Sequence, residues 1–228
     1  RKIEILGFEE TSLGPLCLRR RELLSEPGTF VTEVTLDHEF MMSSYNTDSE
    51  RAISRRAVEI HGGDQLRALV GGLGLGYTAR ELLSEPKVAS VEVVEFLPLV
   101  VQWMREGLFP LSDELCAAER LTVVDGDVYG RLHDEPTDTF DLIVIDVDHS
   151  PADQLGEGDH GFYSPQGLSG AKRHLRHGGV MAIWSYAEDS SFADAMRETF
   201  ASVRVEPIRT LNTLVGHEQT DWLFFGSD

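Results

Sequence analysis

The chain has 228 residues, of which 41% are hydrophobic and 26% are charged. This length predicts one main globular domain with a small appendage and excludes two full domains. The formal charge of −19 argues against a nucleic-acid surface, which needs a broad basic patch. No apolar run is long enough to span a bilayer, so we expect a soluble, cytoplasmic protein with no membrane and no nucleic-acid partner.

Cysteine and histidine residues give no sign of metal or redox chemistry. Cys17 and Cys116 lack the spacing of a redox motif or a zinc site, and two cysteines do not make a disulfide framework. His133, His174 and His177 likewise have no partner at ligand spacing. We therefore expect reduced thiols and no metal site.

Short alternating apolar runs fill the first part of the chain, up to about residue 45. The turn-forming pairs Gly14-Pro15 and Pro27-Gly28 separate them. This pattern predicts a small antiparallel β unit over residues 1–46. The runs are Lys2–Ile5, Leu16–Leu18, Phe30–Leu36 and Glu39–Met42.

A helix is predicted next, from Thr47 to about Ile60. Thr47-Asp-Ser-Glu50 has the spacing of a capping box, and Gly62-Gly63 is a stop signal. The helix opens the predicted main domain, which fills residues 47–228.

A glycine-rich turn follows the first buried strand of that domain, within Leu69–Leu83. It contains Gly71, Gly72, Gly74 and Gly76. Such a turn lets the backbone approach a ligand closely, and the helix after it attracts an anionic group. The dinucleotide fingerprint needs a third glycine where this chain has Tyr77. The observed spacing, Gly-x-Gly-x-Gly, is instead typical of sites for nucleoside sulfonium compounds such as S-adenosylmethionine (AdoMet), although a tight connection without a ligand is the alternative.

Further apolar strands alternate with helical segments, which predicts an α/β fold with a mostly parallel, seven-stranded sheet and helices on both faces. The last two strands have only a short connection, so we expect an antiparallel hairpin at one edge. The predicted strands are Val88–Glu95, Leu121–Val124, Phe140–Ile145, Val180–Trp184, Val203–Ile208 and Trp222–Phe225. The predicted helices are Leu97–Leu108, Pro165–His177 and Ser191–Phe200.

Carboxylates stand at the ends of three predicted strands, where ligands of open α/β sheets bind. Glu95 is the candidate for the ribose hydroxyls. Asp127 is the candidate for an adenine amino group, with a plain turn as the alternative. Asp146 and Asp148 are two residues apart in extended chain and therefore face the same side, and His149 beside them is a candidate proton acceptor.

The expected site is drawn from these segments. The expected catalytic residues are Asp146, Asp148 and His149. The expected cofactor-binding residues are Gly71, Gly72, Gly74, Gly76, Glu95, Phe96, Asp127, Val128 and Asp146. The glycine-rich loop over about Gln154 to Phe162 is a candidate lid.

The order of the motifs resembles the spermidine synthase family, which has the class I AdoMet-dependent methyltransferase (Rossmann-like) fold. The resemblance covers most of the chain from about Val34 to Trp184. The matching segments are Val70–Glu81, Val93–Glu95, Gly126–Val128, Phe140–Asp146, Phe162–Pro165 and Leu175–Gly179. Leu36-Asp37, followed by an apolar strand, is also similar to the small N-terminal β domain of that family.

The resemblance implies that Glu95 holds the ribose, Asp127 the adenine amino group, and Asp146 the attacking amine. Three departures accompany it. Gly74 stands where the family usually has an aspartate for the aminopropyl amine. The family's Asp-x-x-Asp-Pro becomes Asp146-Val-Asp-His-Ser-Pro, and a Tyr-His-Glu segment near the first helix is not evident. Loss of the aspartate leaves room near Gly74 for a methionine carboxylate.

The resemblance thus implies a transferase of the polyamine-biosynthesis type that moves an aminopropyl or methyl group to a small, cationic amine. The donor is AdoMet or decarboxylated AdoMet, and the by-product is S-adenosylhomocysteine or methylthioadenosine. Family analogy adds a homodimer built on the N-terminal β unit. The alternatives are an AdoMet-dependent methyltransferase for an unrelated small molecule, and a degenerate nucleoside-binding partner subunit. A nicotinamide oxidoreductase is disfavoured by Tyr77.

Overall fold

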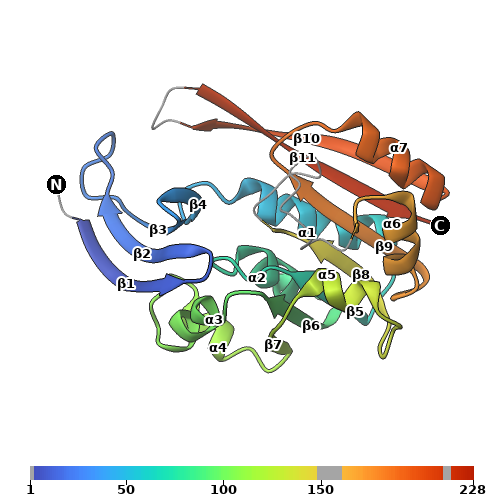
Figure 1. The fold of residues 1–228 in the computed structure, drawn as a ribbon, viewed down its shortest axis with the longest axis horizontal. Coiled ribbons are helices and arrows are strands. Elements are labelled where there is room, and N and C mark those ends of the chain that lie inside the picture. The colour runs from blue at the N-terminus through green and yellow to red at the C-terminus, as the bar shows by residue number, and fades with distance from the viewer. Residues whose placement is uncertain (1–2, 148–160, 213–216) are drawn as a thin grey trace.

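The computed structural model describes residues 3–147, 161–212 and 217–228, and it has the α/β fold that the sequence predicts (Figure 1). A seven-stranded sheet has the strand order β10-β11-β9-β8-β5-β6-β7. Its strands from β9 to β7 are parallel, and β11 and β10 are antiparallel at one edge. The strands are β5 (Leu66–Gly71), β6 (Val88–Glu95), β7 (Leu121–Asp125), β8 (Phe140–Ile145), β9 (Leu175–Ser185), β10 (Ser202–Asn212) and β11 (His217–Ser227).

Helices cover both faces of this sheet, because its strands are apolar on both sides. In β8, Leu142 and Val144 enter one core cluster, and Ile143 and Ile145 enter the other. The first cluster takes side chains from α1 (Asp48–His61), α2 (Tyr77–Ser84), α3 (Pro98–Arg105) and α4 (Ser112–Cys116). The second takes them from α5 (Val128–His133), α6 (Pro165–Lys172) and α7 (Ser190–Thr199). No helix in the described ranges is long and apolar enough to cross a membrane.

A separate four-stranded antiparallel sheet precedes α1, as the alternating runs predict. Its strands are β1 (Ile3–Thr11), β2 (Gly14–Glu22), β3 (Phe30–Leu36) and β4 (Glu39–Ser43). One row of cross-strand partners, Gly7, Leu18, Val34 and Met42, faces the main sheet. Leu18 and Val34 are fully buried in the first core cluster, so both sheets share one hydrophobic core.

Two helix predictions need correction. The predicted helix Pro165–His177 ends at Lys172, because Leu175 already pairs with Phe140 as part of β9. This long-range strand pairing overrides the local helical pattern. The predicted helix Leu97–Leu108 is also shorter, and the short helix α4 follows it.

The first helix has the predicted extent, but its start is not a capping box. Thr47 caps α1 without a side-chain hydrogen bond, and its carbonyl accepts from the N–H of Arg51. The carboxylate of Glu50 accepts a hydrogen bond from the Ser49 hydroxyl at 3.0 Å. Glu50 is therefore available for a role other than capping.

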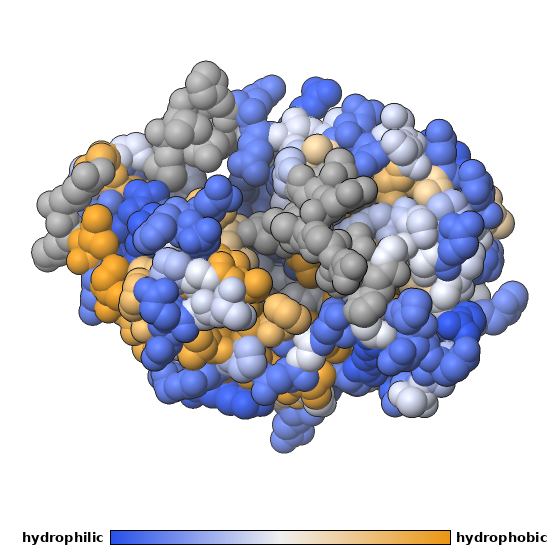
Figure 2. Space-filling view, in the orientation of Figure 1, coloured by the Kyte–Doolittle hydropathy of each residue, from blue (hydrophilic) through white to orange (hydrophobic). Residues whose placement is uncertain are grey.

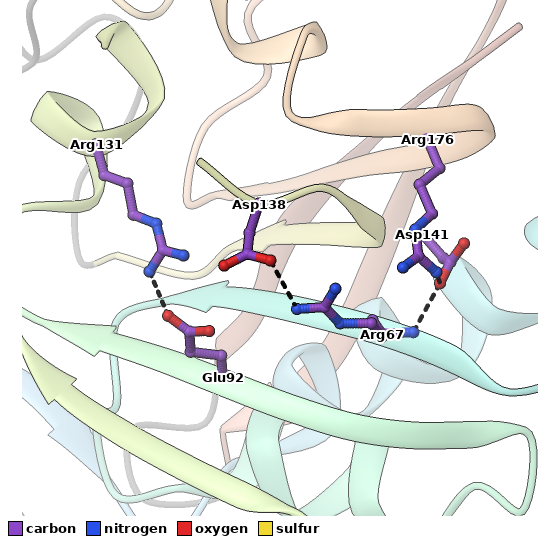
Figure 3. A network of polar contacts seen from close by, with 6 residues as sticks. All are labelled: Arg67, Glu92, Arg131, Asp138, Asp141 and Arg176. Carbon is purple, nitrogen blue, oxygen red and sulfur yellow. Dashed lines mark hydrogen bonds and ion pairs between the residues drawn. The ribbon is translucent and has the colours of Figure 1, made fainter. Parts of the chain in front are cut away.

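A charged network ties the strands together toward their amino ends (Figure 3). The Arg67 N–H and the Arg176 guanidinium both donate to Asp141, at 2.8 and 3.0 Å. The guanidinium groups of Arg67 and Arg131 lie over the ring of the buried Phe140, at 5.3 and 5.5 Å. These contacts involve α5, β5, β8 and β9, and they hold the sheet at the end away from the glycine-rich turn.

Candidate functional site

The structure gathers the predicted site segments at the carboxyl ends of the parallel strands. The Asp146 N–H donates to the Gly71 carbonyl, and the Gly72 N–H donates to the Val94 carbonyl, both at 2.9 Å. The Gly126 N–H donates to the Glu95 carbonyl at the same distance. The ends of β5, β6, β7 and β8 therefore form one continuous edge.

The glycine-rich turn passes so close to β8 that it has no room for a side chain at Gly72. This residue has φ +95°, and a Cβ atom there would lie 2.3 Å from the Asp146 carbonyl oxygen. Gly71 ends β5, and Gly76 is the N-cap residue of α2. Gly74 faces the N-terminal sheet, where the Met42 sulfur lies 3.4 Å from the position of a Cβ atom.

Glu95 anchors the turn through its carboxylate. The side chain is 7% exposed, and its two oxygens accept from the N–H groups of Leu73 and Leu97, at 2.7 and 2.8 Å. Burial raises the pKa of Glu95, and backbone donors, Leu97 first, oppose the rise. The carboxylate joins the end of β6 to the turn after β5, which fixes the turn in place.

The other expected cofactor-binding residues surround this anchor. Asp127 is the N-cap of α5, where its carboxylate accepts from the Tyr129 N–H at 2.9 Å. Val128 is buried against Gly71. Phe96 is 62% exposed beside Glu95, so its ring is accessible. The edge thus combines an exposed aromatic ring with two fixed carboxylates.

Asp146 is partly buried at the end of β8 and accepts a hydrogen bond from the Thr78 hydroxyl. The backbone carbonyl of Thr78 accepts from the Ser54 hydroxyl at 2.9 Å, so Asp146, α2 and α1 are connected. Asp148 and His149 lie outside the described residues, as do residues 154–160 of the expected lid.

Two acids that the sequence reasoning did not select lie near Asp146. Burial raises the pKa of Asp146 to about 6, and the charge of Asp221 adds to this rise. Burial also raises the pKa of Glu50 to about 8, with further contributions from the charges of Asp146 and Asp221. Asp221 is 3% exposed and accepts from the Gln219 amide at 3.1 Å. We call Glu50, Asp146 and Asp221 the acid cluster.

The acid cluster can retain a proton at neutral pH, because three negative charges in a poorly hydrated space repel one another. A positively charged ligand would remove that repulsion and displace the proton. Within the described ranges, no group of three His, Cys, Asp or Glu side chains is arranged to hold a metal ion. Clustered carboxylates attract a cationic ligand.

Comparison with known proteins agrees with the resemblance seen in the motifs. No protein-family model matches the chain. A polyamine aminopropyltransferase of Streptomyces coelicolor is 35% identical over 88 residues, covering 38% of this chain and 16% of that protein. One from Pseudomonas aeruginosa is 29% identical over 146 residues, covering 59% and 39% of the two chains. The chain thus matches well under half the length of these relatives.

Solved structures show the same fold over nearly the whole chain. A spermidine synthase in complex with the transition state analogue AdoDATO has a TM-score of 0.76 at 17% identity, covering 98% of this chain and 73% of that one. The spermidine synthase from Thermotoga maritima has a TM-score of 0.71 at 17% identity, covering 98% and 72%. The fold of this chain, including its N-terminal sheet, is therefore that of the spermidine synthases.

Proposed function

We propose that the chain is a spermidine synthase-like transferase that moves an alkyl group from a sulfonium nucleoside to a small, cationic amine. The observation that carries this proposal is the acid cluster around Asp146, directly beside the glycine-rich turn. The names of the sequence relatives, polyamine aminopropyltransferases, favour aminopropyl as the transferred group.

The donor is AdoMet or decarboxylated AdoMet, bound along the edge formed by β5, β6 and β7. We assign the ribose to Glu95, the adenine amino group to Asp127, and the face of the adenine ring to Phe96. Val128 and the glycines Gly71, Gly72, Gly74 and Gly76 shape the backbone around the nucleoside. The exposed ring of Phe96 and the fixed carboxylate of Glu95 support this assignment.

The amine acceptor binds at the acid cluster, and Asp146 accepts the proton that the amine loses. The amine nitrogen forms a bond to the carbon attached to sulfur, and the electrons of the broken C–S bond return to sulfur as a neutral thioether. The thioether is a good leaving group, so the protein mainly positions the nucleophile. A carboxylate whose pKa is about 6 is well matched to take a proton near neutral pH. Asp148 and His149 are proposed to assist.

A second candidate is methyl transfer to a small molecule. The observation that favours it is Gly74, which offers no carboxylate for an aminopropyl amine and is adjacent to the Met42 thioether. In that case the by-product is S-adenosylhomocysteine instead of methylthioadenosine. Chromatographic identification of the by-product distinguishes the two reactions.

The acid cluster also predicts the effect of one substitution on turnover. We expect Asp146→Asn to lower kcat/KM at least about 100-fold, because the amide cannot accept the proton or attract the ammonium group. The assay incubates protein, donor and a panel of diamines and polyamines, and measures the thioether nucleoside. Asp194→Asn, an exposed acid on α7, is the matched control and should keep full turnover. Full turnover by Asp146→Asn on the true acceptor would contradict the role.

We propose in addition that the outer face of the N-terminal sheet forms a homodimer contact. One row of cross-strand partners on that face, from β1 to β4, is Phe8, Cys17, Thr35 and Phe40. Phe8 and Phe40 are 53% and 61% exposed. Figure 2 shows hydrophobic side chains gathered at this end of the molecule. An exposed apolar patch on a highly charged protein supports a protein contact there.

A further inference from the structure

Arg51, in the first turn of α1, has a buried donor atom that no residue of the described chain satisfies. Its Nε atom is inaccessible to water and has no hydrogen-bond partner among the described residues. Buried polar atoms without partners are rare in folded proteins, and each one calls for an explanation. An acceptor supplied by a ligand is such an explanation.

The position of Arg51 beside the glycine-rich turn indicates which ligand. Its guanidinium carbon lies 5.8 Å from the centroid of the Tyr77 ring, and Tyr77 directly follows the turn at the start of α2. Burial raises the pKa of Tyr77, and the charge of Arg51 and the side chain of Ser44, in the chain after β4, both oppose this rise. Arg51 and Tyr77 therefore border the turn on the side of the N-terminal sheet.

Stacking on Tyr77 does not satisfy the donors of Arg51. A guanidinium group over an aromatic ring uses its face, whereas its N–H groups point outward in its plane. Those in-plane donors match the two oxygens of a carboxylate, and a charge-assisted pair of this kind is strong. Within the described chain, Arg51 forms no ion pair that would occupy them.

The glycine-rich turn next to Tyr77 contributes no acidic side chain at Gly74. Gly74 contributes no side chain, and the Met42 sulfur lies 3.4 Å from the position where a Cβ atom would stand. An aspartate there would attract an amine and repel a carboxylate, whereas glycine and methionine do neither. Gly74 therefore places no charge in the turn that would repel a carboxylate bound to Arg51.

We propose that Arg51 binds the α-carboxylate of the donor, and hence that the donor is AdoMet and not its decarboxylated form. This inference rests on the proposed function and specifies the donor of the same site, and it replaces aminopropyl as the transferred group. A carboxylate-bearing donor can give up its methyl group and leave S-adenosylhomocysteine. It can also give up an aminocarboxypropyl group and leave methylthioadenosine. In both cases the amine forms one N–C bond, one C–S bond breaks, and the amine proton passes to Asp146.

Calorimetric titrations with S-adenosylhomocysteine and with methylthioadenosine test the proposal, because only the first has the carboxylate. The wild-type protein should bind S-adenosylhomocysteine at least about tenfold more tightly. Arg51→Met should remove that preference without weakening methylthioadenosine, and Arg51→Lys should retain part of it. The control Arg55→Met, on the same helix with a 52% exposed side chain, should bind as wild type. Thermal melting checks that each variant is folded.

Gly74→Asp provides a test in the opposite direction. Gly74 has φ +53°, which aspartate tolerates better than most residues, and the nearest atom to a new Cβ is the end of a flexible methionine. The new carboxylate should reverse the preference toward methylthioadenosine.

The outcomes separate the two proposals. Failure of the wild type to bind either nucleoside would overturn the proposed function itself. Equal or tighter binding of methylthioadenosine by the wild type would overturn only the donor assignment. A preference that survives in Arg51→Met would show that another group binds the carboxylate, and it would also overturn the role of Arg51.

Discussion

The fold changes the charge state of Glu50. Its pKa of about 8 lies well above the ordinary value of a glutamate, so the folded protein binds this proton more tightly than the unfolded chain. The unfolded chain loses the proton first as pH rises. The contribution of Glu50 to the free energy of unfolding therefore decreases between about pH 4.5 and pH 8. It stays at this lower value at higher pH.

Glu50→Gln should stabilise the protein at alkaline pH, because it removes a charge that the acid cluster repels. At pH 9 we expect a gain on the order of 1–3 kcal/mol, seen as a rise of several degrees in Tm. At pH 4 the variant and the wild type should melt together. Differential scanning calorimetry at both values measures the effect. Glu119→Gln, at an exposed position, is the control. A stability gain that is equal at both pH values would contradict the pKa.

Gly72 is the residue whose size most limits the site. A methyl group at this position would lie 2.3 Å from the Asp146 carbonyl, in a backbone conformation that side chains rarely adopt. We expect Gly72→Ala to lower the free energy of unfolding by about 2–4 kcal/mol and to abolish nucleoside binding. Denaturant unfolding and calorimetric titration measure the two effects.

Gly126→Ala is the matched control for this substitution. Gly126 lies on the same edge, but a Cβ atom there would meet its nearest neighbour, Val94, at 3.4 Å. This variant should lose much less stability. Equal losses in both variants would show that the edge tolerates no side chain at all, and that the contact with Asp146 is not the cause.

At the scale of elements, strands that are buried on both faces were predictable from sequence. Val88–Glu95 and Phe140–Ile145 have the predicted bounds, because continuous apolar runs need no partner to be recognised. The end of α6 was not predictable, since it depends on the pairing of Leu175 with Phe140 in a distant strand. Helix α5 was missed because it has only 6 residues, too few to show a period.

The candidate site shows the same contrast. Glu95 and Asp146 follow apolar strands, and such positions can be recognised in the sequence. Glu50 matched the pattern of a helix cap, and Asp221 lies in the last strand of the chain. Only the fold brings these two acids near Asp146. Asp221 could have been noticed in the sequence because it directly precedes the apolar run Trp222–Phe225. A charged residue inside a buried strand is unusual.

At the scale of the whole molecule, the exposed apolar side chains on the outer face of the N-terminal sheet predict self-association. We expect the wild type to sediment as a dimer at micromolar concentration, and Phe8→Glu with Phe40→Glu to sediment as a monomer. Leu24→Glu is the control, because Leu24 is 72% exposed but lies between β2 and β3. Analytical ultracentrifugation distinguishes these states. A monomeric wild type at 50 µM or above, roughly the upper range for a stable dimer, would contradict the prediction.

The position of Met42 beside Gly74 has a consequence for how proteins of this fold diversify. Met42 belongs to the small sheet, whereas Asp146 and Asp221 belong to the large one. Mutations in β4 can therefore change the surroundings of the glycine-rich turn, while the acid cluster stays the same. Exchanging the first 46 residues between relatives would test in the laboratory whether the small sheet alone changes the surroundings of the turn.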